Sequence, residues 1–130
     1  MDEAAEAGAK IIVFPELCIT GYTCSDLFLQ DILLNSAKKA LVKIAEHTKN
    51  LDALVFVGVP IAVGGELYNA AAALNHGNIL GFTTKSFLPN YGEFYEMRQF
   101  RPGPKKQRKF CLAERDSIWT AAFICGKSDG

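Results

Sequence analysis

Two short apolar runs, each stopped by a proline, constrain the fold of this chain most strongly. Residues 11–14 read IIVF before Pro15, and residues 53–59 read ALVFVGV before Pro60. Runs this short and apolar are typical of strands buried on both faces in α/β proteins. The first run leads directly into Glu16, a carboxylate that near the interior would need a partner or a role as an acid or base. The alternative is that Pro15 turns the chain outward and Glu16 is solvated, as most glutamates are.

The totals describe one globular domain. The chain has 130 residues, of which 49% are hydrophobic and 22% charged. Fourteen basic residues balance fourteen acidic ones, so charge gives no reason to expect nucleic acid or an anionic membrane as a partner. No apolar stretch reaches the roughly 18 residues of a membrane span, and the Met-Asp-Glu start is unlike a signal peptide. A cytoplasmic location is expected.

The cysteines and histidines predict neither a metal site nor a histidine-based catalytic triad. The four cysteines are Cys18, Cys24, Cys111 and Cys125. They form no C-x-x-C pair, and His47 and His76 stand alone, so no zinc site is expected and the thiols should be free. The Gly-Lys-Ser near the end does not make a phosphate loop, because Ala121 occupies the place of the required glycine.

The pattern of apolar residues predicts an α/β domain with helices on at least one face of its sheet. Helices are expected over residues 2–7 and 31–48, and strands over residues 10–14, 53–59, 67–74 and 79–84. Gly64-Gly65 and His76-Gly77-Asn78 supply the turn signals between the later strands. After Gly103 a basic run, PKKQRKF, begins a segment of weak periodicity, for which a solvated or unstructured tail is predicted.

Residues 83–100 concentrate groups that could carry chemistry. Lys85 follows a predicted strand, and Glu93, Glu96 and Arg98 come within the next thirteen positions. A lysine at a strand end can aim its charge at a developing oxyanion, and a nearby glutamate can orient it. An ordinary surface ion pair explains these residues equally well, unless Glu16 converges on the same place.

Two stretches together resemble the nitrilase, or carbon-nitrogen hydrolase, superfamily. They are GAKIIVFPELCITGY and TTKSFLPNYGEFYEMRQFRPG. Within the superfamily, LPNYGEFYE combined with ITGYTCSDLFLQ is most similar to the N-terminal glutaminase domain of glutamine-dependent NAD synthetases. The resemblance covers residues 2–103 and implies part of a nitrilase-like α-β-β-α sandwich.

The resemblance implies a catalytic Glu, Lys and Cys, with a second Glu in support. Glu16 matches the general base, Lys85 the lysine and Glu93 the supporting glutamate, while Tyr22 and Tyr91 match positions that line the glutamine pocket. The implied reaction transfers the acyl group of glutamine to the cysteine, releases ammonia and then hydrolyses the thioester.

The resemblance also implies partners. Glutamine would be the substrate, and a synthetase domain in the parent enzyme would use the ammonia with ATP and magnesium. The glutaminase domain itself would need no cofactor and no metal. A homo-oligomer is expected, with neither nucleic acid nor membrane as a partner.

The chain departs from the family pattern after Gly103. The family's nucleophile is usually followed by an acidic residue, whereas Cys125 precedes Gly126-Lys127. We therefore predict a truncated glutaminase domain over residues 1–104 and an unassigned, non-native tail over residues 105–130, inactive because the nucleophilic cysteine is missing. Alternatives are a stand-alone nitrilase-like amidase acting on another carboxamide, and an inert fold remnant.

Overall fold

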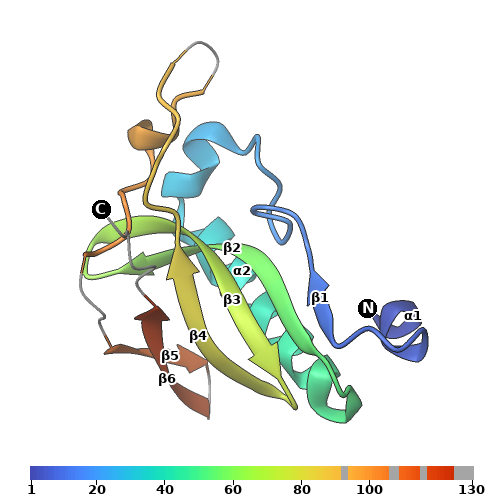
Figure 1. Cartoon of the computed structure of the whole chain (residues 1–130). Coiled ribbons are helices and arrows are strands. Elements are labelled where there is room, and N and C mark those ends of the chain that lie inside the picture. Colours follow the sequence, from blue (N-terminus) through green and yellow to red (C-terminus); the bar gives the residue numbers. More distant parts are fainter. Residues whose placement is uncertain (92–93, 106–108, 115–116, 125–130) are drawn as a thin grey trace.

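The structure, a computed structural model, contains a single mixed sheet flanked by helices (Figure 1). It describes residues 1–91, 94–105, 109–114 and 117–124, the last two segments by their backbone alone. The strands are β1 (Ile11–Val13), β2 (Leu54–Val63), β3 (Glu66–Asn75), β4 (Asn78–Thr84), β5 (Lys109–Glu114) and β6 (Ser117–Ile124). The helices are α1 (Asp2–Glu6) and α2 (Asp31–His47), with 3-10 turns η1 (Ser25–Leu29), η2 (Thr48–Asn50) and η3 (Glu96–Arg98).

The strand order β1-β2-β3-β4-β6-β5 combines a parallel pair at one side with a meander in the middle. β1 runs parallel to β2 and is joined to it through α2, whereas β2, β3 and β4 are successive antiparallel neighbours. β6 runs parallel to β4, so β1, β4 and β6 all end at the upper edge of the sheet in Figure 1. The predicted α/β class is confirmed, and the strands expected over residues 53–59, 67–74 and 79–84 are present.

The main core lies between α2 and one face of the sheet. Leu41 and Ala45 of α2 are fully buried against the alternate residues Val55, Val57 and Val59 of β2. Alternate side chains of a strand point to the same face of the sheet, so β2 presents a continuous apolar surface to α2. No helix in the described part of the chain has the length and apolar character that a membrane crossing demands.

β1 differs from its prediction because only one of its faces is covered. Ile12 is buried in the main core, whereas Ile11 and Val13 are 66% and 71% exposed. β1 is also the edge strand of the described sheet. The expectation of burial on both faces was therefore wrong for this strand in the structure, although it holds for the centre of β2.

Pro60 does not end β2, which continues to Val63. The carbonyls of Phe56 and Gly58 accept hydrogen bonds from Phe14 and Ile19, so the even-numbered residues of β2 direct their backbone groups toward β1. At Pro60 the strand β1 has already ended, and the missing N–H breaks no bond of the ladder to β3.

Two strands follow residue 105, where an unstructured tail was predicted, so that prediction was wrong. β5 and β6 pair antiparallel, with Glu114 opposite Ser117, and β6 joins the edge of β4. The sequence of β6, SIWTAAFI, is rich in β-branched and aromatic residues, which favour strands. Without a Gly or Pro turn signal between the two runs, sequence reasoning did not recognise the hairpin.

A second, smaller core fixes the loops at the upper edge. It is made by Leu17, Phe28, Leu67 and Phe100, with the Phe28 and Phe100 ring centroids 5.0 Å apart. Leu17 is fully buried although its φ is +51°, a left-handed conformation that a branched residue adopts only at a cost of about 1–3 kcal/mol. Burial of its side chain holds the turn that follows Glu16.

Gly58 lets this turn cross β2 at very close range. A Cβ at Gly58 would lie 2.2 Å from the backbone nitrogen of Leu17 and 2.6 Å from the carbonyl oxygen of Pro15. Real side chains do not tolerate such distances to backbone atoms, so only glycine fits. The position of Glu16 therefore depends on Gly58.

We expect Gly58→Ala to lower the free energy of unfolding by about 2 kcal/mol or more, because the new methyl group must displace backbone. Chemical denaturation measures this loss. Ala62→Ser on the exposed side of the same strand is the control and should change stability by less than about 0.5 kcal/mol. Equal stability of Gly58→Ala and wild type would contradict the close approach.

Candidate active site

Glu16 and Lys85 meet at the upper edge of the sheet. Glu16 follows the end of β1, Lys85 follows the end of β4, and the lysine Nζ lies 2.8 Å from Glu16 Oε1. Because β1 and β4 end at the same edge, residues 69 positions apart in the sequence come into contact. The expected convergence of these two groups is confirmed, and the solvated alternative for Glu16 is replaced by a half-exposed ion pair.

Asn69 of β3 forms hydrogen bonds with both Glu16 and Lys85. Its carbonyl accepts a hydrogen bond of 2.8 Å from the backbone N–H of Lys85, and its side-chain Nδ2 donates to Glu16 Oε1. The pairing of Ala70 with Thr84 explains this, because it places Asn69 beside Lys85. Asn69 is buried, so its amide group fixes the Glu16 carboxylate from inside the sheet. Sequence reasoning missed this residue, because strand β3 gave no polar motif.

Glu96 is the second carboxylate on Lys85. Its Oε1 lies 2.8 Å from Lys85 Nζ and accepts a hydrogen bond of 2.9 Å from the Tyr22 hydroxyl. Glu96 is 5% exposed, which makes it the most buried charged side chain of the group. Glu93, to which the supporting role was assigned from sequence, lies outside the described residues. One sequence signal for a buried position at Glu96 was the apolar Phe100, four residues later. Phe100 packs in the second core and thereby anchors η3, which begins with Glu96.

The two neighbouring carboxylates stabilise the positive charge of Lys85. Desolvation by burial would lower the pKa of Lys85, but hydrogen bonds and charges from Glu16 and Glu96 outweigh it and raise that pKa above the ordinary value. The lysine is therefore a protonated, oriented cation at neutral pH.

An open pocket of about 290 Å³ lies beside this cluster. Its lining combines the polar groups of Glu16, Asn69 and Lys85 with apolar surface from Phe56 and Ala71. A small amide placed here would meet a carboxylate, an ammonium group and an amide side chain at one end. Within the described residues, no group of three or more His, Cys, Asp or Glu is arranged to hold a metal ion.

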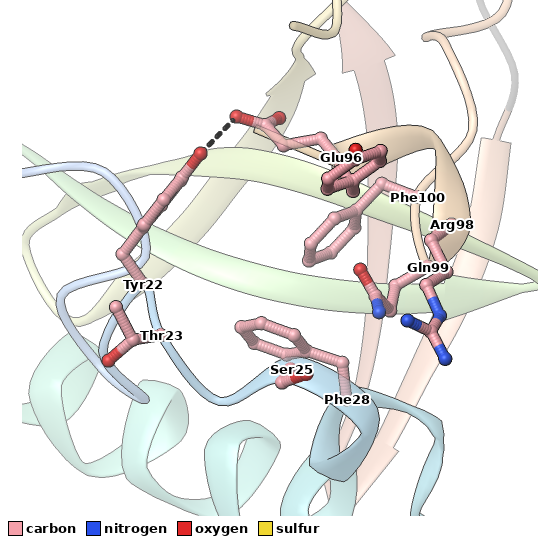
Figure 2. A pocket seen from close by; sticks show the side chains of 9 residues that line it. Tyr22, Thr23, Ser25, Phe28, Glu96, Arg98, Gln99 and Phe100 are labelled. Carbon is pink, nitrogen blue, oxygen red and sulfur yellow. Dashed lines mark hydrogen bonds between the residues drawn. The ribbon is translucent and has the colours of Figure 1, made fainter. Parts of the chain in front are cut away.

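A second pocket, of about 260 Å³, is lined in part by Glu96 (Figure 2). Phe28 and Phe100 form part of its wall, and Tyr22 reaches across it to Glu96. The structure thus brings Tyr22, a predicted pocket residue, into contact with the cluster. Tyr91 is 71% exposed, and its ring packs edge-on against Phe94 with centroids 5.8 Å apart, so it is not drawn into the cluster.

The two cysteines that the structure describes by their side chains, Cys18 and Cys24, are hydrogen-bonded to backbone carbonyls. Cys18 Sγ lies 3.7 Å from the Gly58 carbonyl oxygen, and Cys24 Sγ lies 3.3 Å from that of Thr20. Both are free thiols bonded to backbone carbonyls. Cys111 is described by its backbone alone, and Cys125 lies outside the described residues.

Comparisons with known proteins agree on one family. The carbon-nitrogen hydrolase family profile matches residues 1–126, beyond the expected domain boundary at residue 104, which stays a prediction. The glutamine-dependent NAD(+) synthetase of Mycobacterium tuberculosis is 35% identical over 122 residues, 94% of this chain and 18% of the relative. That of Aquifex aeolicus is 46% identical over 103 residues, 79% of this chain and 18% of the relative. The chain therefore spans about a fifth of the length of these relatives.

Solved structures give the same result. A glutamine-dependent NAD(+) synthetase from Cytophaga hutchinsonii is 35% identical with a TM-score of 0.80, covering 92% of this chain and 20% of that one. A mutant amidase of the nitrilase superfamily from Nesterenkonia is 27% identical with a TM-score of 0.60, covering 92% and 45% respectively.

Tyr22 provides a test of the cluster. Partial burial, then the hydrogen bond and the charge of Glu96, raise the pKa of Tyr22 from 10.0 to about 12. A titration followed by near-ultraviolet absorbance should contain a component near that pH, and Tyr22→Phe should remove it. If Tyr22→Phe instead removed a component near the ordinary value of 10.0, the contact would be contradicted.

The same pKa shift predicts how stability depends on pH. Since folded Tyr22 binds its proton more tightly than unfolded Tyr22, its contribution is complete below the unfolded pKa and is lost as pH rises toward about 12. Denaturation at about pH 9 and about pH 11 should show a larger loss for wild type than for Tyr22→Phe.

Proposed function

The chain belongs to the carbon-nitrogen hydrolase family, and from this premise we propose that it forms part of a glutaminase that supplies ammonia for NAD synthesis. The contact of Lys85 with both Glu16 and Glu96 carries the proposal, because it gathers an acid-base group and a fixed cation at one pocket. The likeness to glutamine-dependent NAD(+) synthetases over most of the chain supports glutamine as the substrate.

Each proposed residue has a role in the first half of the reaction. Glu16 takes the proton of a cysteine thiol, and the thiolate attacks the side-chain amide carbon of glutamine. The Lys85 ammonium stabilises the negative oxygen of the tetrahedral intermediate. The C–N bond then breaks, and Glu16 returns the proton to the departing nitrogen, which leaves as ammonia.

The second half returns the site to its starting state. Glu16 takes a proton from water while the water oxygen attacks the thioester carbon. The C–S bond breaks, the thiolate regains a proton from Glu16, and glutamate leaves. The sum is glutamine plus water giving glutamate plus ammonia. Tyr22 and Tyr91 are proposed to line the glutamine pocket, and Glu93 to support the catalytic set.

The wider setting follows from the same likeness. The ammonia is proposed to pass to a synthetase domain of the parent enzyme, which uses ATP and magnesium. The glutaminase segment requires no cofactor of its own in this scheme. A cytoplasmic location and a homo-oligomeric parent enzyme belong to the same proposal.

The fold likeness favours this function over a stand-alone amidase. Both structural neighbours cover 92% of the chain, but the synthetase from Cytophaga hutchinsonii has the higher identity and TM-score. An amidase acting on another carboxamide remains the second candidate for the same cluster, since the catalytic groups would be identical.

The nucleophile separates two versions of the proposal. In the first, based on the Gly-Lys that follows Cys125, the chain lacks a nucleophilic cysteine and is inactive alone. One observation favours a second version, in which Cys125 is the nucleophile. β6 runs parallel to β4 with Ile124 opposite Thr83, so β6 ends at the edge where Lys85 follows β4. The family match also continues through residue 126.

The roles of Glu16 and Lys85 can be tested in a chimera in which residues 1–104 of this chain replace their counterpart in the Aquifex aeolicus relative, so that the relative supplies the rest of the domain. Glu16→Gln and Lys85→Ala should each reduce glutamine-dependent NAD formation at least about 100-fold, because they remove the base and the oxyanion cation. Synthesis from added ammonia should continue at the parental rate.

Two exposed ion pairs supply matched controls. Glu66→Gln and Lys10→Ala make the same chemical changes at the Arg101 and Asp52 pairs and should leave both activities intact. Glutamine-dependent activity that survives in Glu16→Gln or Lys85→Ala would refute the assigned roles.

An assay of the isolated chain distinguishes the two versions of the proposal. If no cysteine is available to Glu16, incubation with glutamine should release negligible ammonia. Measured turnover that Cys125→Ser abolishes and Cys18→Ser spares would establish the second version and overturn the first.

A further inference from the structure

We propose that Asn69 is a positioning residue for the acid-base step, which holds Glu16 by one carboxylate oxygen and leaves the other oxygen to exchange protons. The inference rests on the proposed function, in which Glu16 is the base, and it adds a residue that this function did not include. Its central observation is that Asn69 Nδ2 and Lys85 Nζ both donate to the same atom, Glu16 Oε1.

The two oxygens of the Glu16 carboxylate have different surroundings. Oε1 accepts both side-chain hydrogen bonds that Glu16 receives from the described residues, whereas Oε2 receives none from them. Two donors, one of them a cation, occupy the lone pairs of Oε1, while the lone pairs of Oε2 stay available for a proton. In the proposed reaction Oε2 therefore takes the thiol proton and returns it to the departing nitrogen.

The chemistry of Asn69 suits this role. An ionised carboxylate only accepts hydrogen bonds, so the amide nitrogen of Asn69 must face Glu16, and not the amide oxygen. Asn69 is 4% exposed, and this bond gives its buried amide a charged acceptor. Unlike a second lysine, an asparagine brings no further charge to a carboxylate that must gain and lose a proton.

The sheet holds Asn69 more firmly than the loop holds Glu16. Asn69 lies opposite Pro60 of β2, and the next residue, Ala70, pairs with Thr84 of β4. Its strand is thus flanked by a neighbour on each side. Groups on paired strands are placed more precisely than groups on loops, so Asn69 can fix the direction of a carboxylate that lies beyond the end of β1.

The contact of Asn69 with Lys85 does not depend on the asparagine side chain. The Lys85 N–H donates to the Asn69 carbonyl at 2.8 Å, and the Lys85 carbonyl accepts from the Gly103 N–H at 3.0 Å. Both contacts join main-chain atoms, so a substitution of Asn69 should preserve them. Asn69→Ala thus removes the hydrogen bond to Glu16 and keeps the backbone that places the oxyanion cation.

The chimera with the Aquifex aeolicus relative tests this role. In Asn69→Ala, kcat for glutamine-dependent NAD formation should fall about 10- to 100-fold, because the base is no longer directed at the thiol. The KM for glutamine should change less than about twofold, and synthesis from added ammonia should continue at the parental rate. A raised KM with unchanged kcat would make Asn69 a substrate contact and overturn the proposal.

Asn75 supplies a matched control on the same strand. Its Nδ2 donates to the Ala53 carbonyl at 3.0 Å, far along the strand from Glu16. Asn75→Ala removes the same type of side chain and the same type of donor, and it should leave both activities unchanged. An equal loss of kcat in Asn75→Ala and Asn69→Ala would show a general effect of weakening β3 and would overturn the positioning role.

Asn69→Leu separates the hydrogen bond from packing and keeps the test decisive if Asn69→Ala does not fold. Leucine has nearly the size of asparagine and suits a buried strand, but it donates nothing. With folding confirmed by circular dichroism and by ammonia-dependent synthesis, Asn69→Leu should lose as much kcat as expected for Asn69→Ala. Parental kcat in Asn69→Leu, or failure of both variants to fold, would make Asn69 a packing residue and overturn the proposal.

The results distinguish failure of this inference from failure of the proposed function. Glutamine-dependent activity that survives in Glu16→Gln refutes the function, whatever the Asn69 variants show. Loss of that activity in Glu16→Gln, together with parental kcat in the Asn69 variants, refutes only the positioning role.

Discussion

The ammonium group of Lys85 lies between two carboxylates, and the arrangement of the upper edge depends on it. Without this cation, Glu96 would be a buried charge with only a phenol as donor, and Glu16 would retain only Asn69. The two contacts bring together β1, β4 and η3, which share no continuous segment of chain. The charge balance of this site therefore depends on the conformation of its loops, because moving any one element leaves a charge without its partner.

Packing makes this electrostatic arrangement possible. The second core holds Leu17 next to Glu16 and Phe100 next to the turn that carries Glu96, so both carboxylates are positioned by buried neighbours in sequence. Gly58 allows the loop after β1 to lie directly on β2. The left-handed φ of Leu17 is tolerated because its side chain is completely enclosed. The buried, left-handed turn at Leu17 thus fixes the direction of the preceding residue, Glu16.

The sequence predicted the elements with strong periodicity and the pair Glu16 and Lys85, since both follow apolar runs whose ends meet in an α/β sheet. It could not identify Asn69, because only the register of β3 with β4 places this asparagine beside Lys85. The contact of Glu96 with Lys85 depends on the path of a loop, which the sequence pattern does not give. The exposed face of β1 and the pairing of β5 with β6 depend on neighbours in space, which composition does not report.

The distances along the chain between the interacting groups have a kinetic consequence. Glu16 contacts a lysine 69 residues later, and Tyr22 contacts a glutamate 74 residues later, whereas β2, β3 and β4 pair through short turns. Closing long loops costs entropy that local hairpins do not face. The meander can therefore assemble early and serve as a template, while the upper edge is completed only when both distant loops have docked on it.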